Sequence, residues 1–168
     1  MNGIIQYKNR IPKLHSSVFV AEGAKIIGDV EIGELSGIWF NAVIRGDVNV
    51  IRIGSRTNIQ DNAVLHVTTT TAPLNIGSDI TIGHSALLHG CTIEDCCLIG
   101  MGAIILDKAY IHQHSIIAAG AIVLEGCNVP EGMLVAGIPA KIKRPLTEEE
   151  KQFIRRSAEN YVSYAQEY

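Results

Sequence analysis

Residues 93–122 read IEDCCL IGMGAI ILDKAY IHQHSI IAAGAI, with an isoleucine at every sixth position. The same spacing continues to Val123 and occurs upstream at Val20, Ile26, Ile32, Ile38, Ile44, Ile53, Ile59, Leu65, Ile76, Ile82 and Leu88. Four places after most of these stands a small or β-branched residue: Ala24, Val30, Ser36, Ala42, Val48, Thr57, Ala63, Ile80, Ala86, Ala103, Ala109, Ser115 or Ala121. A period of six fits neither a helix nor a simple strand alternation and marks an internal repeat. The repeat predicts a β-solenoid.

Each six-residue unit is expected to form one short strand and one corner, with its aliphatic and small residues pointing inward. Parallel strands then stack coil upon coil around a narrow column, and the β-helix domain is predicted over residues 1–140. An ordinary sandwich or βαβ protein is the alternative, but it would not produce so many matches in phase. Glycines at the corners are expected to adopt unusual backbone angles: Gly28, Gly54, Gly77, Gly83, Gly100 and Gly120.

The repeat is interrupted in three places. Its phase slips between Val48 and Ile53, and the step from Leu88 to Ile93 is one residue short, so bulges or tighter corners are expected there. The largest interruption, residues 67–73, is polar and ends in proline, which predicts a loop that leaves the coil directly after His66.

The repeat ends near Pro139, and residues 141–168 are predicted to be a linker and a C-terminal helix. Thr147 and Glu150 have the spacing of a capping box, and acidic residues suit the first turn of a helix. The helix is expected to pack along the prism or to reach a neighbouring subunit. Its apolar stripe would comprise Ile154, Ala158, Tyr161, Val162 and Ala165.

Composition limits the partners. The 168 residues are 47% hydrophobic but only 5% aromatic, which suits a narrow interior of branched aliphatics in one domain. Fourteen basic and 17 acidic residues give a net charge of −3 without a basic run, so neither nucleic acid nor an anionic membrane is an expected partner. With no apparent signal peptide or apolar span, we expect a soluble cytoplasmic protein. The four cysteines lack a zinc-binding pattern and are expected to be reduced thiols: Cys91, Cys96, Cys97 and Cys127.

Three histidines lie within the repeat: His66, His84 and His89. A catalytic zinc commonly takes three protein ligands and keeps one position for water, and neutral imidazole is its most frequent ligand. The spacing is equally compatible with three unrelated corner histidines, so both interpretations stay open here. His112 and His114 also have a metal-like spacing, but without a third partner they are expected to be solvated.

Six motifs together closely resemble the γ-class carbonic anhydrase family, over nearly the whole chain: Arg45-Gly46-Asp47, Asn58-Ile59-Gln60-Asp61-Asn62, Leu65-His66, Ile82-Gly83-His84, Leu88-His89-Gly90-Cys91 and Ile99-Gly100-Met101-Gly102-Ala103. The resemblance implies a left-handed parallel β-helix that forms a homotrimer, with each metal site between two subunits. It also implies that His66 and His89 come from one subunit and His84 from its neighbour.

The same resemblance implies roles for the polar residues. Arg45 and Asp61 would form an ion pair across the interface, with Asp47 supporting it. Gln60 would hydrogen-bond the water or hydroxide on the metal, and Asn58 would line the pocket. Zinc is the expected metal, although Fe²⁺ and Co²⁺ also suit three imidazoles. The implied reaction is the reversible hydration of carbon dioxide to bicarbonate, with a metal-activated water as nucleophile.

The chain departs from the family pattern where protons would leave the site. Well-characterised members carry glutamates after the Arg-Gly-Asp motif and in the loop after the first ligand, but this chain has Val48 and a threonine run. Members with the same loss have a tyrosine in the C-terminal helix, which Tyr161 matches better than Tyr164 or Tyr168. The acids that would carry protons away from the site, and so support a high catalytic rate, are therefore missing at both places.

Two other functions fit a hexapeptide repeat. One is an acyltransferase or coenzyme A thioesterase, which needs a single general-base histidine and a coenzyme A groove rather than three converging imidazoles. The other is a non-catalytic trimer that binds metal and has lost the activity.

Overall fold

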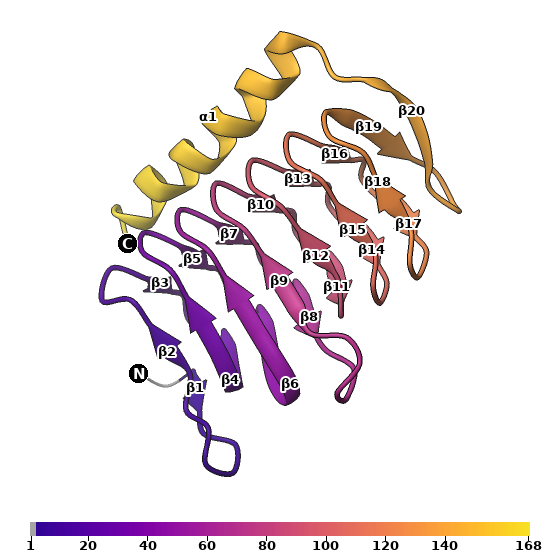
Figure 1. Cartoon of the computed structure of the whole chain (residues 1–168). Helices are drawn as coiled ribbons and strands as arrows, with labels where there is room; N and C mark the ends of the chain where they lie inside the picture. The colour runs from indigo at the N-terminus through magenta and orange to yellow at the C-terminus, as the bar shows by residue number, and fades with distance from the viewer. Residues whose placement is uncertain (1–2) are drawn as a thin grey trace.

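In the computed structural model, which describes residues 3–168, the chain winds into a parallel β-helix of about seven turns with one helix along its side (Figure 1). This confirms the fold class predicted from the repeat. The first two residues of the predicted domain 1–140 lie outside the described part.

The strands form two sheets. The eight-stranded sheet contains β3 (Phe19–Val20), β5 (Gly37–Ile38), β7 (Asn58–Ile59), β10 (Thr81–Ile82), β13 (Leu98–Ile99), β16 (Ile116–Ile117), β19 (Met133–Ala136) and β20 (Lys141–Pro145). The twelve-stranded sheet contains β1 (Ile4–Ile5), β2 (Lys13–Leu14), β4 (Lys25–Ile32), β6 (Val43–Ile53), β8 (Val64–His66), β9 (Leu74–Ile76), β11 (Leu87–His89), β12 (Thr92–Ile93), β14 (Ile104–Ile105), β15 (Tyr110–Ile111), β17 (Ile122–Val123) and β18 (Asn128–Val129).

These sheets make three faces. The first face is the eight-stranded sheet. The long strands β4 and β6 each pair with different neighbours along their two halves, so the twelve-stranded sheet divides into two faces. The second face runs from β1 through the first halves of β4 and β6 to β8, β11, β14 and β17. The third face runs from β2 through their second halves to β9, β12, β15 and β18.

The inward positions of the repeat form the core. On the second face the inward column is fully buried, and it consists of Ile26, Ile44, Leu65, Leu88, Ile105 and Val123. Buried polar side chains at the corners bond to the next coil: the Ser36 and Thr57 hydroxyls donate to the carbonyls of Gly54 and Gly77. Stacking identical positions in this way removes one apolar row per face from water, which is the main stabilising term.

The interruptions lie where the sequence indicates, with one correction. Ile82 pairs with Ile99, 17 residues on, whereas Ile99 pairs with Ile117, 18 residues on, so the short step is accommodated without losing the register. The slip near Val48 appears as an irregularity between β4 and β6. Val48 itself is 40% exposed, and its expected inward place is wrong, because the inserted residues leave that position to the fully buried Ile51.

The corner glycines serve two different purposes. Gly28 and Gly120 have positive φ, as expected. Gly54, Gly77, Gly83 and Gly100 do not, so that expectation is wrong for them. At Gly83 and Gly100 a Cβ atom would meet the backbone of the next coil, at 2.7 Å from the Met101 nitrogen and 2.4 Å from the Ala119 nitrogen. At these two positions close stacking of the coils, rather than the backbone angle, requires glycine.

The C-terminal segment closes the first face. Part of the expected linker forms β20, which pairs antiparallel with β19 and covers that sheet edge. The helix α1 (Glu148–Ala165) has the predicted capping box of Thr147 and Glu150. It lies across β5, β7 and β10 and buries Ile154 and Ala158 (Figure 1). Nowhere in residues 3–168 does a helix combine the length and apolar character of a membrane crossing.

Candidate metal centre

His66 and His89 end two neighbouring strands on the second face. They are register partners at the ends of β8 and β11, one coil apart. The Nδ1 atom of His66 lies 3.1 Å from the Nε2 atom of His89, and both rings are partly buried. Parallel stacking of equivalent repeat positions therefore brings these two imidazoles together.

Each of these imidazoles also contacts a carboxylate through its other nitrogen. The Nε2 atom of His66 lies 3.0 Å from Oδ1 of Asp47, and the Nδ1 atom of His89 lies 2.5 Å from Oδ1 of Asp107. Burial acts to raise the pKa of both carboxyls, but the hydrogen bonds outweigh it, so each pKa lies below its usual value. Both groups are ionised at neutral pH and can only accept hydrogen bonds.

These contacts assign the protons on both rings. An ionised acceptor at one nitrogen requires an N–H there, so a neutral His66 carries its proton on Nε2 and a neutral His89 on Nδ1. The two nitrogens that face each other are then bare lone pairs at 3.1 Å. Two such lone pairs repel each other unless a cation, either a metal ion or a proton, binds between the two nitrogens.

The separation of the two nitrogens fits a zinc ion. Two nitrogens bound at about 2.0–2.1 Å in a tetrahedral geometry lie about 3.3 Å apart, close to the 3.1 Å found here. Metal-bound histidines typically give their second nitrogen to a carboxylate, as both do here. The residues present therefore suit a metal, but they provide two ligands of the three expected.

His84 lies at the other edge of the second face, in the corner before β11. Its Nδ1 atom contacts Asp61 at 2.9 Å, which leaves Nε2 available, and 45% of its side chain is exposed. Its backbone N–H donates to Oε1 of Gln60 at 3.2 Å. The Gln60 amide in turn donates to Asn58, at 3.1 Å.

Asn58 is buried beneath α1 and its amide donates to Thr81, whose hydroxyl contacts Ser157 of the helix. A continuous chain of hydrogen bonds thus runs from α1 to His84. In the single chain, Asn58 and Gln60 hold the corner of His84 and are not among the residues that line the pocket beside it.

Tyr161 lies in the same region as His84. Its ring packs edge-on against Trp39 at 5.3 Å, and both rings line a pocket of about 390 Å³ together with Asp61 and His84. Burial first, and the nearby Asp61 charge second, raise the pKa of Tyr161. The phenol is therefore protonated at neutral pH and can donate a hydrogen bond into this pocket. Tyr164 and Tyr168 line it as well.

A single chain does not unite the two halves of the expected ligand set. His66 and His89 are the last residues of β8 and β11, whereas His84 lies before β11. Within residues 3–168 no three histidine, cysteine, aspartate or glutamate side chains are arranged to hold a metal by themselves. Arg45 forms an ion pair with Asp47 of its own chain, and Asp61 contacts the His84 imidazole.

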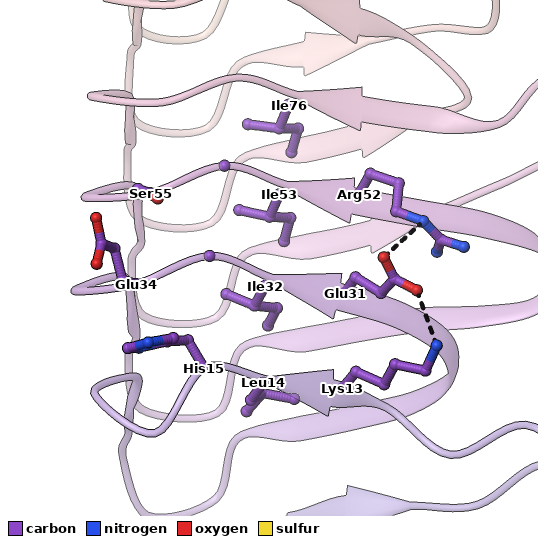
Figure 2. A pocket seen from close by; sticks show the side chains of 12 residues that line it. Lys13, Leu14, His15, Glu31, Ile32, Glu34, Arg52, Ile53, Ser55 and Ile76 are labelled. Carbon is purple, nitrogen blue, oxygen red and sulfur yellow. Dashed lines mark hydrogen bonds and ion pairs between the residues drawn. The ribbon is translucent and has the colours of Figure 1, made fainter.

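A separate depression lies away from these histidines. A depression of about 840 Å³ lies on the third face, over β2, β4 and β6. Figure 2 shows Lys13, Glu31 and Arg52 joined in a row of ion pairs beside it. These opposite charges pair with one another. The residues that line this depression do not include His66, His84 or His89.

Two other histidines have local partners, and Cys91 is buried. His112 contacts Glu94 and Asn128, and His114 contacts Glu131, as expected for solvated corners. Cys91 is buried, and burial raises the pKa of its thiol to about 12. It belongs to the interior of the coil.

Sequence reasoning missed Asp107, the partner of His89. The residue sits within the regular repeat as the third member of ILDKAY, where an acidic corner residue attracts no notice. The available signal was its place one coil after His89, since β11 pairs with β14. Using it requires the coil length at that point, which the short step between Leu88 and Ile93 makes ambiguous.

The six-residue repeat and the parallel β-helix that it forms place this chain among hexapeptide-repeat proteins. Residues 90–125 match the family described as bacterial transferase hexapeptide (six repeats). The chain is also similar to the crystal structure of a hexapeptide transferase family protein from Anaplasma phagocytophilum, with a TM-score of 0.95, 43% identity, and coverage of 100% of this chain and 99% of that one.

Similarity to named relatives narrows the class. The chain is 47% identical over 163 residues to γ carbonic anhydrase 2, mitochondrial, of Arabidopsis thaliana; this covers 94% of the chain and 59% of the relative. It is 44% identical over 165 residues to a carbonic anhydrase of Geobacillus kaustophilus, covering 98% and 90%. The chain thus spans about three fifths of the plant relative and nearly all of the bacterial one. It belongs to the γ carbonic anhydrase family.

Proposed function

We propose that this protein is a zinc-dependent carbonic anhydrase that hydrates carbon dioxide reversibly to bicarbonate in a homotrimer. The observation that carries the proposal is the pair of imidazole nitrogens, on His66 and His89, that lie 3.1 Å apart while each ring contacts a carboxylate through its other nitrogen. Family membership supplies the reaction, and the placement of His84 supplies the reason for assembly.

The proposed ligand set is divided between subunits. His66 and His89 of one chain would bind together with His84 of a neighbour, and each ring is oriented by a carboxylate on its other nitrogen. A zinc ion held there supplies a water whose pKa is lowered to about 7.

The other residues have roles that follow from their positions. Gln60, beside His84, is the proposed hydrogen-bond partner of the reacting water, with Asn58 holding its amide. Tyr161 contributes a protonated phenol to the pocket that Asp61 and His84 line. Arg45, half exposed at the edge of the second face, is available to the partner's Asp61.

An uncovered apolar row supports the assembly. Outward side chains of the second face form a ladder of register partners between the two histidine-bearing edges, and two of them, Val64 and Leu87, are 39% and 36% exposed. The row consists of Val43, Val64, Leu87, Ile104 and Ile122. Exposed apolar rows flanked by polar groups are typical of subunit interfaces. A second copy docked here would bring its His84 edge against the His66–His89 edge.

Subunit mixing tests the division of the site. Trimers of His84→Ala alone, or of His89→Ala alone, should each lose zinc, because every site lacks a ligand. Unfolding and refolding a 1:1 mixture of the two should restore zinc and hydration activity in about a quarter of the sites, since one in four interfaces joins two intact halves. Zinc is measured per chain after gel filtration in chelator-free buffer.

The matched control mixes His66→Ala with His89→Ala. Both lesions then lie in the same half of the site, so no mixed interface is complete and no zinc should return. Equal zinc recovery in the two mixtures, or full zinc in His84→Ala alone, would show that the three histidines do not form this shared site.

An acyltransferase or thioesterase is the second candidate, favoured by the hexapeptide transferase descriptions of the family model and the Anaplasma structure. Carbon dioxide hydration and acetyl-coenzyme A hydrolysis, assayed side by side on zinc-loaded protein, separate the two. Zinc bound at one per chain without either activity would instead support a non-catalytic metal-binding trimer. Location in the cytoplasm stays a prediction, and the Arabidopsis relative is named as mitochondrial.

A further inference from the structure

The threonine loop contacts the candidate metal centre through Asp107. The hydroxyl of Thr68, the second residue of the loop 67–73, donates to Oδ2 of Asp107 at 2.6 Å. The other carboxylate oxygen, Oδ1, contacts Nδ1 of His89 at 2.5 Å. One carboxylate thus joins a loop that leaves the coil after β8 to a histidine at the end of β11.

We propose that Asp107 and Thr68 are positioning residues for the metal centre: Asp107 fixes His89 as the tautomer with its proton on Nδ1, and Thr68 holds Asp107 in the orientation that does so. The proposal rests on the metal site described above. A histidine fixed in this way presents a bare Nε2, which is the atom that faces His66. The tautomer is selected before any metal arrives, so binding need not reorganise the ring.

The position of the loop supports this role. Its base is tied to the coil by the amide of Asn49, which donates to the Thr68 carbonyl at 3.0 Å, and the loop is closed by two backbone hydrogen bonds between Thr68 and Ala72. These bonds leave the Thr68 hydroxyl pointing at Asp107 while Thr69 and Thr70 are exposed. A partly buried carboxylate loses hydration, and the two donors compensate for that loss. This loop lacks the acid that the family resemblance would place there. Its Thr68 instead orients Asp107, the carboxylate that contacts the candidate metal ligand His89.

Two readouts on the full-length protein test the proposal. The first is the tautomer of His89 in metal-free protein, from nitrogen-15 NMR of its imidazole, assigned by the loss of its signals in His89→Gln. Wild-type protein should show the proton on Nδ1, whereas Asp107→Ala should show a mixture or the Nε2 form. The second is zinc affinity from competition with a chelator, which should fall about 10- to 100-fold in Asp107→Ala.

Thr68→Val removes the hydroxyl at nearly constant shape and should lower zinc affinity roughly 3- to 10-fold, as for one lost hydrogen bond. Thr68→Ser should restore wild-type affinity. Thr69→Val is the matched control, because that side chain is exposed in the same loop, and it should change neither readout. If Asp107→Ala does not fold, Asp107→Asn keeps the shape and removes the charge.

The outcomes distinguish this proposal from the metal site itself. Wild-type protein that binds no zinc overturns the site, and the tautomer of His89 then has no ligand to serve. Wild-type protein that binds zinc, with an unchanged tautomer or unchanged affinity in both Asp107 variants, overturns the positioning role alone. A Thr68→Val loss that serine does not rescue overturns the part assigned to the hydroxyl.

Discussion

Replacing Leu87 with glutamate should dissociate the proposed trimer while leaving each chain folded. Leu87 points outward from the second face, between Val64 of β8 and Ile104 of β14, its register partners. Its exposed fraction of 36% is the part that a neighbouring subunit would cover. The part already covered packs within the chain, and the exposed part is available to the proposed interface.

The magnitude follows from the exposed fraction. Full burial of a leucine contributes about 1.5–3 kcal/mol, so covering the remaining third adds roughly 0.5–1 kcal/mol per interface. Leu87→Ala should then weaken association roughly 2- to 5-fold, because 1.4 kcal/mol corresponds to about a factor of ten. Leu87→Glu should weaken it more than about 100-fold, since burying an unpaired charge costs several kcal/mol.

Sedimentation velocity over a dilution series measures the association, and circular dichroism checks that the β-helix remains folded. Ile142→Glu is the matched control: Ile142 is 51% exposed on β20, away from the second face, and its replacement should leave the assembly intact. Unchanged association in Leu87→Glu, with folded chains, would refute the assignment of the second face as the interface.

Three further predictions concern the fold. Ile99→Ala, at a fully buried position, should lower the free energy of unfolding by about 2–5 kcal/mol in denaturant titrations, and Ile99→Val by only about 0.5–1.5 kcal/mol. Thr147→Ala should cost about 1 kcal/mol by removing the N-cap of α1, whereas Thr147→Ser should be near neutral. Cys91 and Cys97, whose burial raises each thiol pKa to about 12, should stay unmodified by a thiol reagent at pH 8 in the native protein and react on unfolding.

The fold was predictable because the repeat states its own geometry. Residues such as Ile99 and Ala103 mark inward positions without knowledge of distant contacts, and the strands formed where those residues indicated. The prediction that Val48 points inward was wrong because the inserted residues of β6 shift the phase of the repeat. Only the pairing of β6 with β4 shows this shift. Strand β20 was not predicted, for a related reason. Its basic sequence has no strand pattern, and pairing with the edge of β19 determines its structure.

Part of the candidate site could likewise be predicted from the repeat, and part could not. Stacking of His66 on His89 follows from equivalent places in neighbouring repeats, and the structure brings them together. The separation of His84 from them came from the family resemblance and not from spacing. Asp107 could be found only once the coil length was known, because its partner lies 18 residues earlier across an irregular step.

The placement of the two edges links metal binding to assembly. Strand β11 runs from the corner of His84 to His89, and the described part of a single chain does not group the three histidines. Any ion that binds all three histidines must therefore bind the assembled state in preference to the single chain, and it stabilises that state by mass action. At a free zinc concentration of about 100 times the dissociation constant this amounts to about 2.7 kcal/mol per site. That is more than the roughly 0.5–1 kcal/mol expected from covering the exposed part of Leu87. Contacts along the apolar row would then set where the subunits dock, while the shared ion makes a large contribution to how tightly they remain together.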